Sequence, residues 1–344
     1  MTEKDYSGTI ATNRTKNAKS SSSSVKENFV KKETKDKKEK KEINTADFDI
    51  ISYKKAGKIA KQVVDYGKNI IKKDMPLSEI ANKIEAEIIK LGGEIAFPVN
   101  LSIDDVAAHY TPTTRDETKA NGLLKVDMGV QVNGCIADTA FTLDLTPEKK
   151  YSKLIQASEN ALDAALTIVK QNKEKTTLSQ IGKVISEEIE KMGFHPIVNL
   201  SGHSLGEFEI HSGLTIPNYD NSSEKQLGEG AFAIEPFATL NSGSGTIYEA
   251  NGGSIYHITS GGQVRDNFAR EVLGWILENK QTLPFSQREI EKQFGTKGLI
   301  AISNLKRAGA IEEYPQLVEK SHTPISQAEN SIIIHEGKVE ILVE

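Results

Sequence analysis

Apolar residues between Tyr53 and Gly92 recur at intervals of three and four, in two groups that are separated by Pro76. This spacing puts the apolar side chains on one face of an α-helix. Gly92 and Gly93 follow the second group, and glycine is common where a helix ends. The pattern therefore predicts two amphipathic helices, with the second ending at the glycine pair.

The pattern then changes twice more along the chain. Residues 96–145 form short β-rich runs that are separated by Asn-Gly pairs. Residues 151–171 and 176–193 return to the helical spacing, and residues 195–262 return to short strands rich in glycine. Two helices followed by a sheet, repeated once, predict an α+β domain of two similar halves.

Residues 263–318 interrupt that order with a stretch rich in lysine and glutamate, whose spacing predicts helices. Its three-helix pattern also resembles a winged-helix element. Binding to nucleic acid and packing against the main domain both fit this pattern, and packing is the commoner role. The last segment predicts a hairpin that turns at Glu336–Gly337. We expect a tail over 1–45, a main domain over 46–262 and 319–344, and an inserted helical subdomain over 263–318.

Only 37% of the 344 residues are hydrophobic, and a polar segment at the N-terminus accounts for this low fraction. Residues 1–42 contain twelve Lys or Arg and seven Asp or Glu, so this segment carries about +5 and the rest about −10 of the net charge of −5. It has too few apolar residues to offset the entropy lost on folding, which predicts a disordered basic tail rich in serine. A solvated spacer and a weak contact with RNA, for instance of the ribosome, both fit, and we favour the spacer.

Several classes of protein are excluded by what the sequence lacks. No apolar stretch approaches the roughly 20 residues of a membrane span, and the N-terminus has no apolar segment typical of a secretory signal. We therefore expect a cytoplasmic protein with no membrane contact. The single cysteine, Cys135, excludes an intrachain disulfide and a cysteine-based zinc finger, so a metal site would need oxygen and nitrogen ligands. We expect a monomer, because the sequence suggests no self-complementary interface.

The strongest local prediction comes from two β-rich runs joined by Asn133–Gly134, the preferred pair for a two-residue type I′ turn. That turn would set Asp127 opposite Ala140 and Asp138 opposite Gly129. The two aspartates then lie diagonally on one face, at roughly 7–8 Å between backbones, close enough to share an ion. A solvated pair of surface aspartates fits this pattern equally well.

A second acid and several histidines favour the ion. Glu235 lies in the otherwise apolar run AFAIEPF, where a strand would bury its carboxylate, and a buried unpaired carboxylate is costly. His203 and His211 lie in the glycine-flanked run NLSGHSLGEFEIHSG, and His109 lies in another polar setting. A lone histidine is more often structural. Three of the seven in such settings favour a functional role.

The motifs AFPVNLSIDDVAAHYTP, KVDMG, CIADTAFTL, NLSGHSLGEFEIHSG, AIEPF and YPQLVEKSHTPISQAEN resemble the successive signatures of the type 2 methionine aminopeptidases of metallopeptidase family M24. They follow the family's order from about residue 46 to the C-terminus. The resemblance implies the pita-bread fold, in which two pseudo-symmetric halves surround a curved antiparallel sheet and an inserted, winged-helix-like subdomain follows the second half.

The resemblance also implies a site with two divalent metal ions. The implied ligands are Asp127, Asp138, His203, Glu235 and Glu329. Four carboxylates would balance the four positive charges of two such ions, and a neutral histidine leaves this balance unchanged. Oxygen and imidazole ligands suit cobalt, manganese, iron or zinc, so the identity of the metal stays open.

The family's mechanism implies roles for the residues around the metals. Two ions 3.5–4 Å apart, as is typical of such sites, can bridge a hydroxide that attacks the first peptide bond. Glu235 is implied to shuttle the proton, and His109 and His211 to bind the scissile amide and stabilise the oxyanion. The implied wall of the methionine pocket consists of Phe97, Ile210 and Tyr314, with Ile255 at a position where some relatives carry histidine.

The implied function is removal of the initiator methionine from nascent polypeptides, with a preference for a small second residue. An Xaa-Pro dipeptidase shares the fold and the ligand types, but that class usually has an arginine-bearing motif at the last ligand, where this chain has QAEN. Type 1 methionine aminopeptidases lack the inserted segment. An inactive relative that binds RNA or ribosomes would have lost metal ligands, whereas this chain retains all five.

Overall fold

The computed structural model describes residues 48–344. The tail expected over 1–45, together with its possible contact with RNA, lies outside the described residues. Within the described part of the chain, no helix is both long enough and apolar enough to cross a membrane.

The two amphipathic helices expected over 53–92 are present as α2 (Ile50–Ile70) and α3 (Leu77–Lys90). Asp49 caps α2, because its side chain accepts a hydrogen bond from Ser52 N at 2.9 Å and so satisfies an amide that has no partner within the helix. The apolar faces of both helices are buried against the strands that follow them. These helices therefore cover the back of the first half of the sheet.

The first half of the sheet is built around the predicted hairpin. Its strands are β1 (Glu94–Ile103), β2 (Val106–Ala108), β3 (Leu123–Val132) and β4 (Cys135–Asp144). Asn133 and Gly134 have φ angles of 52° and 84°, the positive values that a type I′ turn needs at both central residues. Asp127 pairs with Ala140, and the register predicted from the sequence is confirmed along the whole hairpin.

The second half repeats the order of two helices and a sheet. Its elements are α4 (Ser152–Asn172), α5 (Leu178–Lys191), β5 (Phe194–Pro196), β6 (Ser201–Leu205), β7 (Thr215–Pro217), β8 (Gly230–Ile234), β9 (Phe237–Leu240) and β10 (Ile247–Ala250). Helix α5 begins with a capping box, in which Thr177 and Gln180 each bind the other's backbone amide. Helices α4 and α5 pack on each other and bury a common apolar core against the strands.

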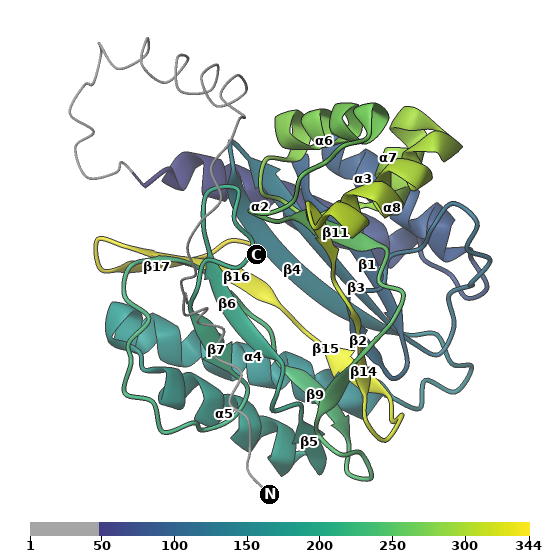
Figure 1. Cartoon of the computed structure of the whole chain (residues 1–344). Helices are drawn as coiled ribbons and strands as arrows, with labels where there is room; N and C mark the ends of the chain where they lie inside the picture. Colours follow the sequence, from purple (N-terminus) through teal and green to yellow (C-terminus); the bar gives the residue numbers. More distant parts are fainter. Residues whose placement is uncertain (1–47) are drawn as a thin grey trace, which may run out of the picture. The chain divides into compact units, whose positions relative to one another are not determined.

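The C-terminal strands connect the two halves, pairing with strands of both. They are β14 (Gln316–Glu319), β15 (Ile325–Gln327), β16 (Asn330–His335) and β17 (Lys338–Ile341). Strand β16 pairs with β17 and β8, and a bridge between Ala140 and Glu329 ties the segment between β15 and β16 to β4 (Figure 1). The hairpin predicted at Glu336–Gly337 is confirmed. The structure is thus the expected α+β pita-bread arrangement.

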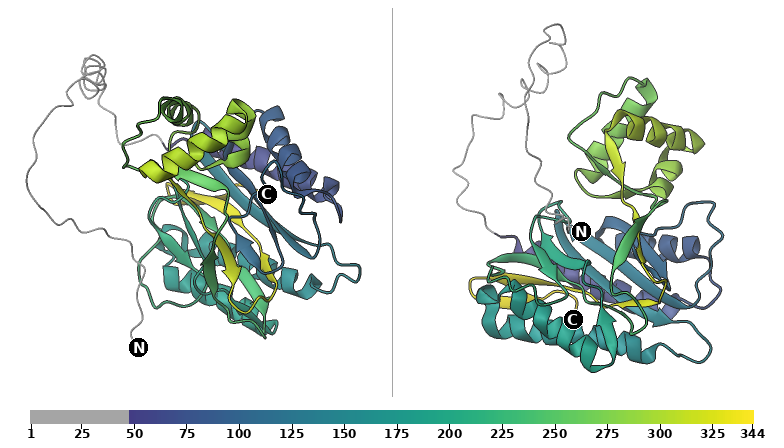
Figure 2. Two further views of the ribbon diagram at one scale, coloured as in Figure 1. Left: turned by 45° about the vertical axis from the view of Figure 1, so that its right-hand side comes forward. Right: turned by 60° about the horizontal axis from the view of Figure 1, so that its bottom comes forward.

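The helical segment expected after residue 262 forms a unit with its own apolar core. Its elements are β11 (Ile255–Ile258), α6 (Asn267–Lys280), β12 (Phe285–Ser286), α7 (Gln287–Phe294), α8 (Thr296–Ala308) and β13 (Ile311–Glu313). Its helices lie on the side of the sheet away from α4 and α5 (Figure 2). The domain boundaries stay a prediction. We propose that the insert runs from β11 to β13, because these strands pair with each other while β14 pairs with β10 and β2.

A buried ion pair connects this unit to α3. The Arg288 guanidinium on α7 pairs with the Glu85 carboxylate on α3, and both side chains are almost completely enclosed. Arg288 also donates a hydrogen bond to Pro112 O at 2.6 Å. These contacts favour the interpretation that the insert packs against the main domain.

Replacing Arg288 should therefore destabilise the protein strongly. We expect Arg288→Met to lower the free energy of unfolding by about 3–5 kcal/mol, because it leaves the Glu85 carboxylate buried without a cation. Burial already raises the pKa of Glu85, and the Arg288 charge opposes that rise. Chemical denaturation measures the loss, and the double variant Glu85→Leu/Arg288→Met should recover most of it. A loss below about 1 kcal/mol in the single variant, the range of exposed ion pairs, would contradict the role of this pair.

Candidate active site

The five implied metal ligands line one cavity, although they come from five separate segments. They are Asp127 on β3, Asp138 on β4, His203 on β6, Glu235 directly after β8, and Glu329 directly before β16. The expectation that Glu235 lies within a strand is wrong: it lies in the break between β8 and β9. Asn218 holds this break in place by donating a hydrogen bond from Nδ2 to Glu235 O at 3.1 Å.

The sheet register explains why three of the carboxylates meet. Asp127 pairs with Ala140, and Ala140 forms a bridge with Glu329, so these three residues share one row across three neighbouring segments. Asp138 pairs with Gly129 in the next row. Directly opposed residues point to the same face, as do residues two apart. The diagonal placement of the two aspartates, predicted from the hairpin alone, is confirmed.

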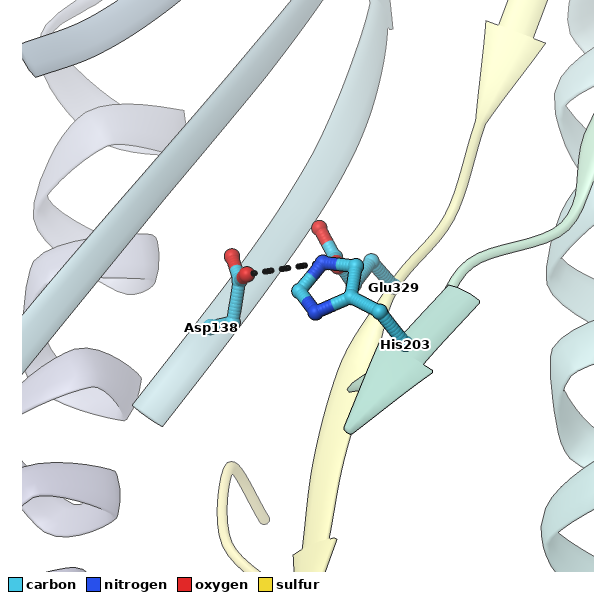
Figure 3. A group of neighbouring side chains, drawn as sticks. All are labelled: Asp138, His203 and Glu329. Atoms are coloured by element: carbon cyan, nitrogen blue, oxygen red, sulfur yellow. Dashed lines mark ion pairs between the residues drawn. The ribbon is translucent and has the colours of Figure 1, made fainter. Parts of the chain in front are cut away.

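Figure 3 shows three of the implied ligands, Asp138, His203 and Glu329, close to one another. His203 Nε2 lies 3.7 Å from Asp138 Oδ2 and 3.6 Å from Glu235 Oε1. One ligand atom each from Asp138, His203 and Glu329 lies within 4.8 Å of the other two. Nitrogen and oxygen bind such ions at about 2.0–2.2 Å, so two ligands of one ion lie no more than about 4.4 Å apart. Only small side-chain movements separate this cluster from a coordination shell.

Unsatisfied oxygen atoms give a second sign of a cation. Asp127 Oδ1, Asp138 Oδ1 and Glu329 Oε2 are buried and have no hydrogen-bond partner among the described residues. Buried polar atoms are rarely left without a partner, and an unpaired buried carboxylate is especially costly. The residues present therefore fit a positively charged group better than they fit one another.

The raised pKa values of the carboxyl groups also indicate that the cluster binds a cation. Burial raises the pKa of Asp127 to about 7. Burial and then repulsion from neighbouring carboxylates raise the pKa values of Asp138, Glu235 and Glu329 well above the usual range. Divalent cations would reverse this effect, since a positive charge beside a carboxylate favours its ionised form.

The nearby histidines are held neutral. Burial, assisted by His211, lowers the pKa of His203 to about 3 and that of His109 to about 4. Burial also lowers the pKa of His211, with His257 as the next cause. Neutral imidazole is the form that binds metals and accepts hydrogen bonds. His109 adopts a positive φ of 64°, a conformation that is uncommon outside glycine and frequent at functional sites.

Tyr314 lies among three histidine rings at the wall of the cavity. Its ring centroid is 5.2 Å from that of His109, 4.8 Å from that of His257 and 6.3 Å from that of His211. His257 was missed by the sequence analysis. The period of two along β11 provides a signal for it, because residues 255 and 257 point to the same face and Ile255 lines the cavity.

The cavity has a volume of about 180 Å³, smaller than the sites that bind drug-sized ligands. Phe97, Ile210 and Tyr314, the implied pocket wall, all line it. Gly129 makes room for the Phe97 ring, because a Cβ at this position would lie 2.3 Å from a ring carbon. The glycine of the KVDMG motif is therefore required by the close approach of this ring.

A model of metallopeptidase family M24 matches residues 52–268, which is more than half of the chain. The chain belongs to metallopeptidase family M24. Membership implies that it binds divalent metal, and the buried cluster of Asp138, His203 and Glu329 provides a place for it.

Known M24 proteins resemble the chain over most of its length. The methionine aminopeptidase of Methanocaldococcus jannaschii is 40% identical over 289 residues, which cover 83% of this chain and 95% of the relative. The solved structure of a thermophilic Arx1 matches with a TM-score of 0.73, 14% identity, and coverage of 87% of this chain and 91% of that one. The methionine aminopeptidase of Rickettsia prowazekii matches with a TM-score of 0.59, 18% identity, and coverage of 87% and 98%. The two structures establish the fold, and the M24 relatives establish a hydrolytic aminopeptidase.

Proposed function

We propose that this M24 peptidase holds two divalent ions in the cavity and removes the N-terminal methionine of nascent proteins whose second residue is small. The observation that carries the proposal is the meeting of four carboxylates, of which Asp138 and Glu329 are buried, and one neutral histidine at a cavity with apolar walls. The 40% identity to a methionine aminopeptidase along nearly its whole length supports the substrate. Two relatives at 40% identity, from Methanocaldococcus jannaschii and Pyrococcus horikoshii, are methionine aminopeptidases, which favours this substrate over an Xaa-Pro peptide.

We propose Asp127, Asp138, His203, Glu235 and Glu329 as the metal ligands. Their four negative charges match two divalent cations, which could be cobalt, manganese, iron or zinc. The ions would supply an acidified water as the nucleophile and would polarise the peptide carbonyl. Glu235, whose Oε1 lies 3.6 Å from His203 Nε2, is placed to take the proton of that water and pass it to the leaving amine.

The two cavity histidines would have different roles. His109 Nδ1 lies 3.1 Å from Pro315 O, a carbonyl oxygen that can only accept. In the neutral ring Nδ1 then carries the proton, and Nε2 is left as an acceptor for the N–H of the scissile amide. For His211 no hydrogen-bond partner of this kind lies within residues 48–344, so its N–H can donate to the oxygen that becomes negative during attack.

The pocket would bind the methionine side chain through its apolar wall. Phe97, Ile210 and Tyr314 provide aromatic and aliphatic surface beside the metal ligands. Burial raises the pKa of the Tyr314 hydroxyl to about 12, so this group stays neutral and can donate a hydrogen bond near the substrate. Ile255, in place of a histidine, makes the wall more apolar. A cytoplasmic location, a monomeric state and a ribosome or RNA contact of the tail remain proposals.

The proposed function is tested by hydrolysis of the peptides Met-Ala-Ser and Ala-Pro after reconstitution with each candidate metal. We expect release of methionine from the first peptide and no cleavage of the second. Elemental analysis of the active protein should show two metal ions per chain. Cleavage of only Ala-Pro would replace the substrate by that of an Xaa-Pro dipeptidase, and metal binding without any cleavage would favour an inactive binding protein.

Replacing His211 tests the role of the cavity histidines. We expect His211→Ala to lower kcat by about 10²–10³-fold with little change in KM, since the lost hydrogen bond acts mainly in the transition state. Steady-state kinetics with Met-Ala-Ser measures the effect. His322→Ala is the matched control, because His322 is exposed and contacts Asp105, and its activity should be unchanged. An equal rise in KM with unchanged kcat would instead assign His211 to ground-state binding.

A further inference from the structure

The side-chain amide of Gln327 is buried next to the ligand cluster with both of its ends unsatisfied. Gln327, the last residue of β15, is 1% exposed. Neither Nε2 nor Oε1 has a hydrogen-bond partner among the residues described. A glutamine amide offers two donors and one acceptor, and burying all of them without partners is costly. This amide is therefore placed for something other than packing.

The backbone of Gln327 is fixed in the sheet, so its side chain has a defined direction. Thr142 Oγ1 donates to Gln327 O at 2.6 Å, and Gln327 N donates to Thr142 Oγ1 at 2.9 Å. Gln327 lies one row from the row of Asp127, Ala140 and Glu329, and two residues before Glu329 on the same face. The side chains of Thr142 and Ala140 are short. The longer side chain of Gln327 can therefore extend over them toward Asp127.

Strand pairing brings the Gln327 side chain near two of the ligands. Gln327 pairs in β15 with Phe237 of β9, two residues after Glu235. Its row also lies next to the row of Asp127 on the same face. The amide has no hydrogen-bond partner among the described residues, which leaves both of its donors available to these carboxylates.

We propose that Gln327 is a positioning residue, which donates its two amide hydrogens to Asp127 and Glu235 and fixes the orientation of both carboxylates for metal binding. Gln327 does not line the cavity, so it acts through the ligands and not on the substrate. The Gln327 amide is an uncharged donor. It can therefore orient the carboxylates without altering the balance between their four negative charges and two divalent ions. The inference rests on the proposed metal site.

The test compares metal binding by the full-length wild type and by Gln327→Met, which keeps the length of the side chain and removes both donors. Each chelated and re-purified protein is titrated with Co²⁺ by calorimetry, and the visible spectrum of bound Co²⁺ reports the ligand geometry. We expect Gln327→Met to bind Co²⁺ about 10–100-fold more weakly, the range typical of residues that orient metal ligands. We also expect its spectrum to change.

Ser326→Ala is the matched control, because Ser326 is a fully buried neighbour on β15 whose Oγ donates to Leu154 O at 2.8 Å. It should lose thermal stability but keep the wild-type affinity and spectrum. Gln327→Asn, which withdraws the amide by one methylene, should also weaken Co²⁺ binding and covers the case in which Gln327→Met does not fold. Wild-type affinity and spectrum in the Gln327 variants, or equal weakening in Ser326→Ala, would overturn the inference. Absence of metal binding in the wild type would instead overturn the proposed function.

Discussion

Asp138→Asn should abolish peptide hydrolysis while making the metal-free protein more stable. The substitution removes a proposed metal ligand, and we expect kcat for Met-Ala-Ser to fall by more than about 10³-fold, the upper end of the cost of losing one group that stabilises the transition state. It also removes one carboxylate of a cluster in which burial, and then repulsion between carboxylates, raise the pKa values of Asp138 and Glu329. The chelated variant should therefore melt at a higher temperature than the chelated wild type.

Asp65→Asn is the matched control for this prediction. It makes the same chemical change at an exposed aspartate, which pairs with Lys61 on the surface of α2. Its hydrolysis rate and its melting temperature should both stay close to those of the wild type. If Asp138→Asn retained substantial activity, Asp138 would not be a metal ligand. If the chelated variant were less stable than the chelated wild type, repulsion among the carboxylates would not be the dominant effect.

The carboxylate cluster should lower the stability of the chelated protein as the pH rises from about 5 to about 7. Burial raises the pKa of Asp127 to about 7 and raises those of Asp138, Glu235 and Glu329 well above their usual values. The folded state then binds more protons than the unfolded state, in which these groups are ionised above about pH 5. Each excess proton lowers the free energy of unfolding by about 1.4 kcal/mol per pH unit. Thermal denaturation of the chelated protein between pH 5 and pH 7 measures this dependence.

Histidine and lysine side chains also make the stability depend on pH, so the effect of the carboxylates is measured by comparing the wild type with Asp138→Asn. Below about pH 6.5, protonation of unfolded histidines opposes the trend, because the pKa values of His203 and His109 are lowered in the folded state. Buried Lys125, whose pKa is lowered to about 7, also opposes it, but equally in wild type and Asp138→Asn. We therefore expect the slope to be less steep in Asp138→Asn by about one proton. If stability changed equally with pH in the wild type and in Asp138→Asn, the carboxylate cluster would not be the cause of the pH dependence.

The repeated halves and the hairpin could be predicted from the sequence because both depend on interactions between near neighbours. Helical periodicity and the glycine pair after it specify α2 and α3, and the Asn133–Gly134 turn alone fixes the register of β3 and β4. Side chains alternate between faces along a strand, so this register also placed Asp127 and Asp138 on a common face. Local chemistry thus predicted half of the carboxylate cluster.

The apolar residues around Glu235 identified it as a candidate metal ligand. Its position in the break between two strands was not predicted. Pro236, which has no N–H to donate to a neighbouring strand, lies in this break, and Asn218 binds Glu235 O from another part of the chain. Glu329 carries no local signal of a metal ligand, and only the family resemblance pointed to it. Its bridge to Ala140 joins residues that are far apart in sequence, and no turn specifies their register.

The amino-acid sequence by itself determined the amphipathic helices, the hairpin with its two aspartates, and the exclusion of thiolate metal sites. The tertiary structure alone decided which residues surround the cluster: Gln327 beneath the ligands and His257 beside Tyr314. The physical reason is that these neighbours come from separate strands that meet only after the curved sheet has formed. Periodicity describes each strand, whereas the pairing between distant strands decides which side chains share a buried space and lose their contact with water.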